Sequence, residues 1–256
     1  MVRKTPAGGY CFLADATTPA APGKDPTDRA HWSKWRSQNY EYLSEKLGAL
    51  EPGSVLLDLG AGPGQFRDLY EAHRYIGLDF QEYPVVSVVA DLTKRLPLAS
   101  DSVDAVVLSN TLEHVPEPAL LLEECRRVLR TRGAVVIVVP FLIRLHQVPH
   151  DFLRYTRYML EYLLAKTGFT DIEVREIGDV FDVHDVILRD LYVVLTKNLE
   201  SSRTAEEARD LRKRVLAPFR ESVRREIESL RASFGDDVGV LGDRQYPHGY
   251  GAVGYK

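Results

Sequence analysis

The chain has 256 residues, a formal net charge of −4 and a pI near 6.0. This length is enough for one well-buried core with one elaborate insertion. This slight excess of acidic residues does not attract nucleic acid or an anionic membrane, so we expect neither as a partner. The longest apolar stretch, 133–143, is far shorter than the roughly 20 residues that span a bilayer. With no long apolar run behind the first basic residues, and only Cys11 and Cys125 as cysteines, we expect a cytoplasmic protein with reduced thiols.

The N-terminal part of the chain differs in composition from the rest. Residues 1–30 are rich in Pro, Ala, Thr, Gly and Asp, which is typical of an irregular arm. A helix is predicted over 31–47, with Trp32 and Trp35 among the residues available for its apolar face. We therefore predict an N-terminal arm and capping helix over 1–52.

From residue 53 onward, short apolar runs alternate with helical patterns. The predicted strands are 55–59, 75–78, 85–90, 103–108, 134–139 and 170–176, and the predicted helices are 65–72, 119–129 and 155–166. Near-continuous β-branched runs between helices indicate a parallel sheet that is covered on both faces. With a last strand returning over 250–255, the sequence predicts a doubly wound, mostly parallel, seven-stranded α/β sheet. Its core is expected over 53–182 and its final strand within 246–256.

The segment 183–245 has a different character and is predicted to be a helical insertion. An apolar helix over 186–195 is followed by charge-dense helical sequence over 204–233. Acids and bases interleave there, which favours exposed helices over a nucleic-acid-binding helix. A lid and a contact in a homodimer are both compatible with this pattern, and the residue spacing does not separate them.

The most informative motif is a glycine turn directly after the first predicted strand, Asp58-Leu59-Gly60-Ala61-Gly62-Pro63-Gly64. Glycines at the carboxyl end of a buried strand let the backbone approach a ligand closely. A dinucleotide favours the spacing G-x-G-x-x-G, but Gln65 occupies the third glycine position here. Asp58 repels a pyrophosphate and suits a ligand that carries an amino group. Spacing and charge both disfavour a dinucleotide-dependent oxidoreductase.

This turn resembles the first motif of the class I S-adenosylmethionine-dependent methyltransferases, and the resemblance extends over about 53–178. It implies S-adenosyl-L-methionine as cofactor, with the glycine turn around the methionine moiety and Asp79 on the ribose hydroxyls. Asp79 and Asp91 taken singly are also compatible with ordinary turn residues. The linker Gln81–Pro84 is too short for the helix usual at this point in the family. The expected cofactor-binding residues are Asp58, Gly60, Ala61, Gly62, Gly64, Asp79, Phe80, Asp91, Leu92 and Asn110.

The segment 146–156 after the fifth strand is our candidate for the methyl-acceptor side. It contains His-Asp-Phe-x-Arg-Tyr-Thr from His150 to Thr156, which resembles a segment of a type 11-like branch often linked to natural-product, sugar or cell-envelope modification. His150 is a candidate general base with Asp151 beside it. The alternative is that this segment caps and pins the following helix. His114 is a second candidate base.

A metal site is not expected from the sequence. His146 and His150 have i,i+4 spacing, but Pro149 argues against a helix that carries both. The leading hypothesis is methyl transfer to an oxygen or nitrogen atom of a small molecule, and the sequence leaves open whether a general base or a metal takes part. A methyltransferase acting on RNA or protein, and a non-catalytic adenosylmethionine-binding scaffold, stay as alternatives.

Overall fold

The computed structural model of the chain describes residues 2–4, 10–12, 27–202, 204–234 and 246–256. Two units emerge from the way the backbone packs. The α/β unit comprises residues 1–139, 145–175 and 251–256, and the helical unit comprises 140–144 and 176–250.

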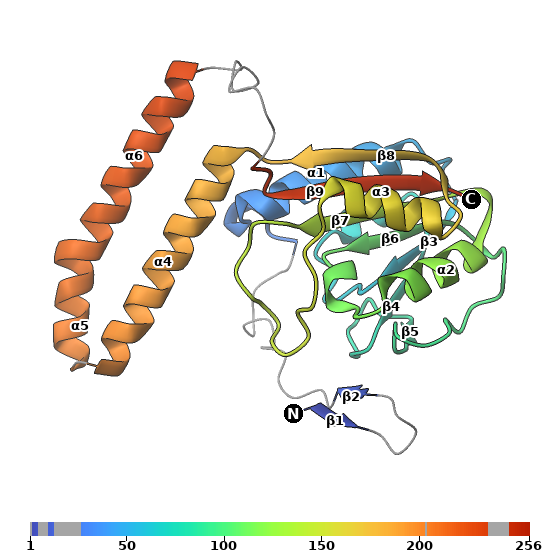
Figure 1. Cartoon of the computed structure of the whole chain (residues 1–256), viewed down its shortest axis with the longest axis horizontal. Helices are drawn as coiled ribbons and strands as arrows, with labels where there is room; N and C mark the ends of the chain where they lie inside the picture. Colours follow the sequence, from blue (N-terminus) through green and yellow to red (C-terminus); the bar gives the residue numbers. More distant parts are fainter. Residues whose placement is uncertain (1, 5–9, 13–26, 203, 235–245) are drawn as a thin grey trace. The chain divides into compact units, whose positions relative to one another are not determined.

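A seven-stranded sheet in the order β5-β4-β3-β6-β7-β9-β8 organises the chain (Figure 1). The strands are β3 (Val55–Leu59), β4 (Arg74–Asp79), β5 (Val88–Val89), β6 (Val103–Ser109), β7 (Leu129–Pro140), β8 (Thr170–Ile177) and β9 (Gly249–Tyr255). Strands β5, β4, β3, β6 and β7 pair in parallel. The end of β9 meets the start of β7, where Arg132 N donates to Lys256 O and Lys256 N donates to Gly133 O, both at 3.0 Å. The predicted doubly wound, mostly parallel sheet is confirmed.

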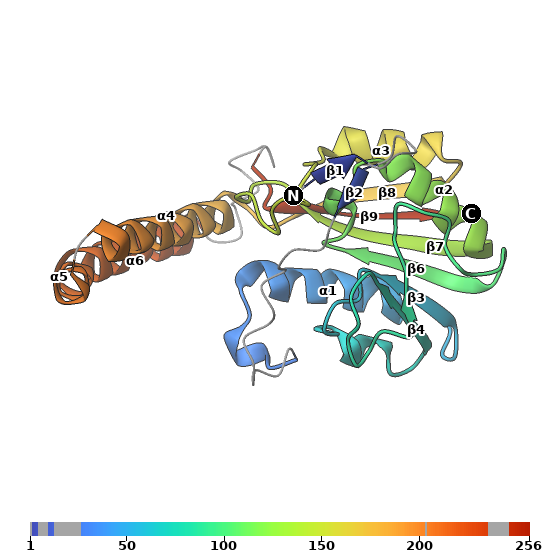
Figure 2. The same ribbon diagram turned by 90° about the horizontal axis from the view of Figure 1, so that it is seen from below.

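Helices cover both faces of this sheet, with α1 (Lys34–Gly48) on one face and α2 (Pro118–Val128) and α3 (Arg157–Lys166) on the other (Figure 2). Local signals fix where the helices begin. Ser33 caps α1 by accepting from Arg36 N at 3.2 Å, and α2 begins with a proline, which suits a first helical turn.

The helix predicted over 65–72 is wrong. Only a short 3-10 helix, η2 (Arg67–Tyr70), lies there. The chain has to return at once to β4, since Gly53 N donates to Ala72 O at 2.8 Å and Arg74 N donates to Ser54 O at 2.9 Å. A stretch this short accommodates a single tight turn rather than a full α-helix with its connections. The third predicted strand, 85–90, is also shorter than expected, since β5 spans only Val88–Val89. Turns alone join β4 to β5, as the short linker indicated.

The buried strands place three loops side by side. The apolar residues of β3 and β6 are almost completely buried, with Leu56, Leu57 and Val106 at 0% exposure. Because β3, β4 and β6 are parallel neighbours, the segments after Leu59, Asp79 and Ser109 emerge at one edge of the sheet. In open α/β sheets that carboxyl edge is where ligands bind.

At the N-terminus, β1 (Val2–Lys4) pairs antiparallel with β2 (Tyr10–Phe12). The rest of the predicted arm up to residue 26 lies outside the described residues.

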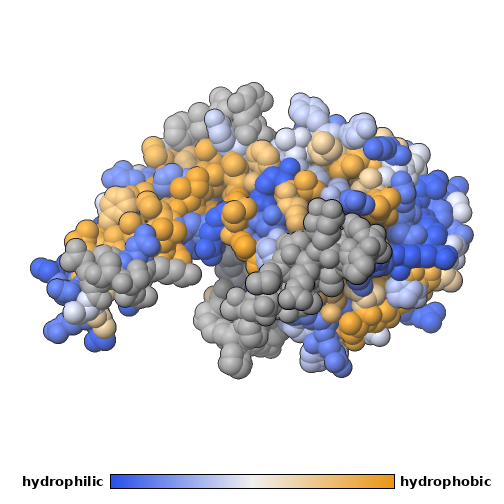
Figure 3. Space-filling view, turned by 60° about the horizontal axis from the view of Figure 1, so that its bottom comes forward, coloured by the Kyte–Doolittle hydropathy of each residue, from blue (hydrophilic) through white to orange (hydrophobic). Residues whose placement is uncertain are grey.

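The helical unit contains α4 (Val180–Ser202), α5 (Ala205–Leu211), a π-helical stretch (Arg212–Leu216) and α6 (Ala217–Phe234). It starts at 176, before the predicted insertion, and residues 235–245 lie outside the described part. Arg231 binds Asp179 at 2.9 Å and Asp182 at 2.8 Å, which joins α6 to the start of α4. Apolar residues cover much of the visible face of these helices (Figure 3). None of the described helices is long and apolar enough to cross a membrane.

Candidate active site

The glycine loop, Gly60–Gly64, is held tightly against the end of β4. Gly60 N and Ala61 N both donate to Leu78 O, at 2.8 and 3.1 Å. Gly60 has a φ of +78°, and a Cβ atom there lies only 2.5 Å from Thr111 Oγ1. A side chain at this position is therefore excluded by backbone conformation and by space. The bare backbone of the loop is left available to a ligand.

Asp79 connects this loop to the segment after β4. Its Oδ2 accepts from Gly62 N and its Oδ1 accepts from Gln81 N, both at 2.9 Å. The side chain is buried, with the residue 6% exposed. A carboxylate offers about four acceptor sites, so two donors leave capacity on both oxygens. Asp79 is therefore held in place with both oxygens able to accept further hydrogen bonds.

Asp58 is buried beneath the loop and accepts from the Tyr75 hydroxyl at 3.1 Å. Burial raises the pKa of Asp58 to about 7, against the effect of hydrogen bonds from Tyr75 and Tyr70, and the nearby Asp79 carboxylate raises it further. Its charge therefore changes near neutral pH. An ammonium group on a ligand favours the ionised form.

Phe80, Asp91 and Leu92 lie along the same edge. Ala90 N donates to Asp79 O at 3.0 Å, which brings the end of β5 beside Asp79. Asp91 Oδ1 accepts from Thr93 N at 2.8 Å and from Thr93 Oγ1 at 2.7 Å, so Asp91 does form the local turn considered from the sequence. Phe80 is 50% exposed, which leaves one face of its ring free to stack on a planar group. Adenine contacts from these residues stay a prediction.

Asn110 follows β6 in a left-handed conformation with φ +52°. Its backbone N donates to Val138 O at 2.8 Å, and its Oδ1 accepts from Trp35 Nε1 at 2.8 Å. The next residue, Thr111, donates through Oγ1 to Leu59 O at 2.9 Å. The segment after β6 is therefore joined both to α1 and to the glycine loop. Sequence reasoning considered Trp35 only for packing or stacking and missed its bond to Asn110.

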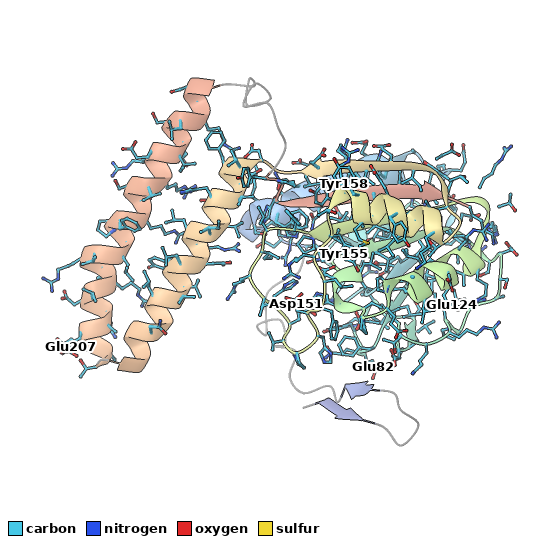
Figure 4. The ribbon with its side chains drawn as sticks, in the orientation of Figure 1. Glu82, Glu124, Asp151, Tyr155, Tyr158 and Glu207 are labelled. Atoms are coloured by element: carbon cyan, nitrogen blue, oxygen red, sulfur yellow. The ribbon has the colours of Figure 1, made fainter. Side chains whose placement is uncertain are left out.

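The 146–156 segment is anchored on η3 (Leu112–His114), the turn after β6. Phe152 N and Leu153 N donate to Glu113 O at 3.0 and 3.2 Å, and the Tyr155 hydroxyl donates to Leu112 O at 2.9 Å. Asp151 and Tyr155, labelled in Figure 4, belong to the loop that connects β7 to α3. These contacts join η3 and the 146–156 segment into one layer of loops at the carboxyl edge of the sheet.

Asp151 is held within this layer by Arg154 and His146. It accepts from Arg154 Nη1 at 2.6 Å and Nη2 at 2.8 Å, and from His146 N at 2.9 Å. Burial opposes its ionisation, but these hydrogen bonds outweigh burial and lower the pKa of Asp151 to about 2. Thr156 caps α3 by accepting from Met159 N at 3.3 Å. Thr156 therefore caps the following helix, whereas Asp151 and Arg154 bind each other and His146 within the loop rather than α3.

His114 is joined to His150 and lies beside His146. Its Nδ1 donates to His150 O at 2.6 Å. The rings of His114 and His146 have centroids 4.8 Å apart and lie at 73° to each other. The Glu113 carboxylate raises the pKa of His146, against the effect of burial, and burial lowers the pKa of His150. Sequence reasoning did not foresee that Glu113, His114 and His146 meet, although they follow the neighbouring strands β6 and β7.

Part of the chain is similar in sequence to known methyltransferases. Residues 57–137 match a family described as a methyltransferase domain. A probable S-adenosylmethionine-dependent methyltransferase of Mycolicibacterium smegmatis is 33% identical over 114 residues, which is 40% of this chain and 44% of the relative. Residues 57–137 are therefore similar to a methyltransferase domain. The cofactor that the motif predicts, S-adenosylmethionine, is the one in the name of this relative. The chain covers only 34–44% of the length of the first curated relatives it matches.

Solved structures support the fold of this methyltransferase domain. An S-adenosylmethionine-dependent methyltransferase from Archaeoglobus fulgidus matches with a TM-score of 0.52 and 19% identity, over 86% of this chain and 94% of the other. The cyclase SpnF matches with a TM-score of 0.54 and 17% identity, over 91% of this chain and 84% of the other. At these identities the likeness concerns the fold alone.

The residues present fit the cofactor. The glycine loop offers backbone without side chains, and the buried Asp79 carboxylate has spare acceptor capacity for ribose hydroxyls. Asp58 supplies a carboxyl group that ionises near neutral pH and suits an amino group.

Proposed function

We propose that the chain transfers the methyl group of S-adenosylmethionine to an oxygen or nitrogen atom of a small molecule. The observation that supports this proposal is the hydrogen bond from Gly62 N to Asp79 Oδ2, which joins the glycine loop to the carboxylate that we assign to the ribose hydroxyls. When bound, the cofactor supplies an electrophilic methyl carbon. The task of the protein is then to align the acceptor with that carbon and exclude water.

The acceptor side is formed by the layer of the turn after β6 and the 146–156 segment. His150 remains our candidate for removing a proton from the acceptor, and His114 is the second candidate. Both lie on loops that are bonded to each other at the carboxyl edge, which supports this placement. Asp151 acts as a positioning residue, because Arg154 and the backbone of His146 occupy its oxygens.

A small acceptor is favoured over RNA by the charge of the chain, which is −4 overall. RNA-binding proteins usually present a basic face for the phosphates. A non-catalytic or differently catalytic protein is the second candidate, since the cyclase SpnF has the same fold. Binding of the cofactor therefore has to be measured separately from methyl transfer.

Two measurements test the proposal. Titration calorimetry with S-adenosylhomocysteine, NAD(H) and NADP(H) in parallel shows which nucleotide binds, and we expect S-adenosylhomocysteine alone. Incubation with methyl-labelled S-adenosylmethionine and separate small-molecule, RNA and protein fractions then locates the label. We expect label in the small-molecule fraction. Label in RNA or protein contradicts the proposed acceptor class, and cofactor binding without any label favours the scaffold.

A further inference from the structure

The carboxyl group of Glu113 is buried without hydrogen bonds in the described part of the structure. Its side chain is 0% exposed, and neither carboxylate oxygen has a hydrogen-bond partner among the described residues. Burying an ionised carboxylate is strongly unfavourable unless it is paired or coordinates a metal. The surroundings of Glu113 should therefore hold a positive charge.

Two histidine nitrogens face this carboxylate. His114 Nε2 lies 3.7 Å and His146 Nε2 lies 3.8 Å from Glu113 Oε1. Both separations exceed a hydrogen bond, and His114 Nε2 is itself buried without a hydrogen-bond partner in the described part of the chain. One ligand atom from each of the three side chains lies within 4.8 Å of the others.

The opposite nitrogen of each ring is already engaged. His114 Nδ1 donates to His150 O at 2.6 Å, and His146 Nδ1 lies 3.3 Å from Asp151 Oδ2. Arg154 Nη2 is 3.5 Å from the same Nδ1 and holds the same carboxylate. A carbonyl or carboxylate behind Nδ1 is the usual outer partner of a metal-bound histidine, because it fixes the tautomer with Nε2 unprotonated. The lone pair of His114 Nε2 then faces Glu113, whereas the tautomer of His146 depends on whether Asp151 accepts from its Nδ1 or Arg154 donates to it.

We propose that Glu113, His114 and His146 bind one divalent transition-metal cation, such as Zn²⁺, Mn²⁺ or Fe²⁺. Two imidazoles and one carboxylate suit these ions, whereas Mg²⁺ and Ca²⁺ prefer oxygen ligands. Ligand atoms around such an ion are about 3.3 to 3.6 Å apart. Each nitrogen therefore moves toward Oε1 by a few tenths of an ångström, and the two nitrogens, which lie within 4.8 Å of each other, approach by up to about 1.5 Å. The sequence had considered His146 with His150 for a metal. The structure brings His146 to Glu113 and His114 instead, which assigns His114 a ligand role in place of a general base.

The position of this cation site gives it a role in the reaction. The three ligands follow β6 and β7 at the same edge as the glycine loop. Three protein ligands leave coordination positions open, and these accept an oxygen or nitrogen atom of the methyl acceptor. This role rests on the proposed function, whereas binding of the cation does not.

Metal binding by the full chain tests the proposal directly. After chelator treatment and its removal, Zn²⁺ or Mn²⁺ is titrated by calorimetry, and Co²⁺ is followed by its visible absorption as a report of the ligand geometry. We expect one cation per chain. Loss of the outer partner of a metal ligand typically lowers metal affinity about 10- to 100-fold, and Asp151→Asn should lower the cation affinity within that range. Glu113→Gln and His146→Gln remove a ligand and should each lower it by more. His73→Gln is the matched control and should bind as the natural chain does.

Binding of S-adenosylhomocysteine separates the possible failures. Variants that still bind it are folded, and loss of cation binding in them supports the site. If the natural chain binds none of the three ions, or if Glu113→Gln and His146→Gln bind them unchanged, the proposal is overturned. Neither result touches the cofactor assignment, which fails only if S-adenosylhomocysteine does not bind.

Discussion

Replacing Asp79 by alanine is the sharpest test of the cofactor cradle. The substitution removes two carboxylate oxygens that hold Gly62 N and Gln81 N at 2.9 Å and that face the ribose in our assignment. A hydrogen bond to a charged group contributes about 1.5 to 3 kcal/mol, so loss of two ribose contacts costs about 3 to 6 kcal/mol. That corresponds to a dissociation constant about 10²- to 10⁴-fold higher for S-adenosylhomocysteine.

Calorimetric titration of S-adenosylhomocysteine measures this change, and a thermal melt checks that the variant is folded. Asp101→Asn is a suitable control, because Asp101 precedes β6 and pairs with Lys256 at 2.7 Å, at the opposite edge of the sheet from the glycine loop. Asp79→Asn retains one acceptor oxygen and should fall between the alanine variant and the natural chain. If a folded Asp79→Ala protein binds S-adenosylhomocysteine with unchanged affinity, the ribose assignment is refuted.

Three further predictions concern the loop and two buried titratable groups. Gly60→Ala and Gly53→Ala both place alanine at positive φ and should each cost about 1 to 2 kcal/mol of stability. Only the alanine Cβ at position 60 also meets Thr111 Oγ1, at 2.5 Å. A thermal melt should show a loss of stability for both variants. Calorimetry should show weaker cofactor binding for Gly60→Ala alone. Because the pKa of Asp58 is about 7, the affinity for S-adenosylhomocysteine should rise between about pH 6 and about pH 7.5, by at most about tenfold per pH unit. Asp58→Asn should remove this pH dependence. If the variant keeps it, Asp58 is not its source. Burial lowers the pKa of His248 to about 4, so the unfolded chain, with a histidine pKa near 6.5, takes up the proton first. The free energy of unfolding should fall by about 2 kcal/mol from about pH 6.5 to about pH 5, and urea denaturation of His248→Gln should lack this contribution.

The layer architecture and the cofactor loop followed from local sequence pattern. Buried β-branched runs that alternate with helices admit few arrangements besides a parallel sheet covered on both faces. Gly60 and Asp79 each directly follow a predicted parallel strand. The carboxyl ends of neighbouring parallel strands lie at the same edge of the sheet, so the two residues belong together there. The helix expected over 65–72 failed because its length depends on where β4 pairs with β3, which local propensity does not encode.

Contacts between distant loops were decided only by the tertiary structure. The sequence placed Asp151 beside His150, whereas the folded chain directs its oxygens to Arg154 and His146. The burial of Glu113 between two imidazoles depends on how the loops after β6 and β7 pack. Glycine spacing and strand pattern are properties of adjacent residues, so a linear chain reveals them. The convergence of side chains from separate loops, and the burial that shifts their proton affinities, depends on three-dimensional packing.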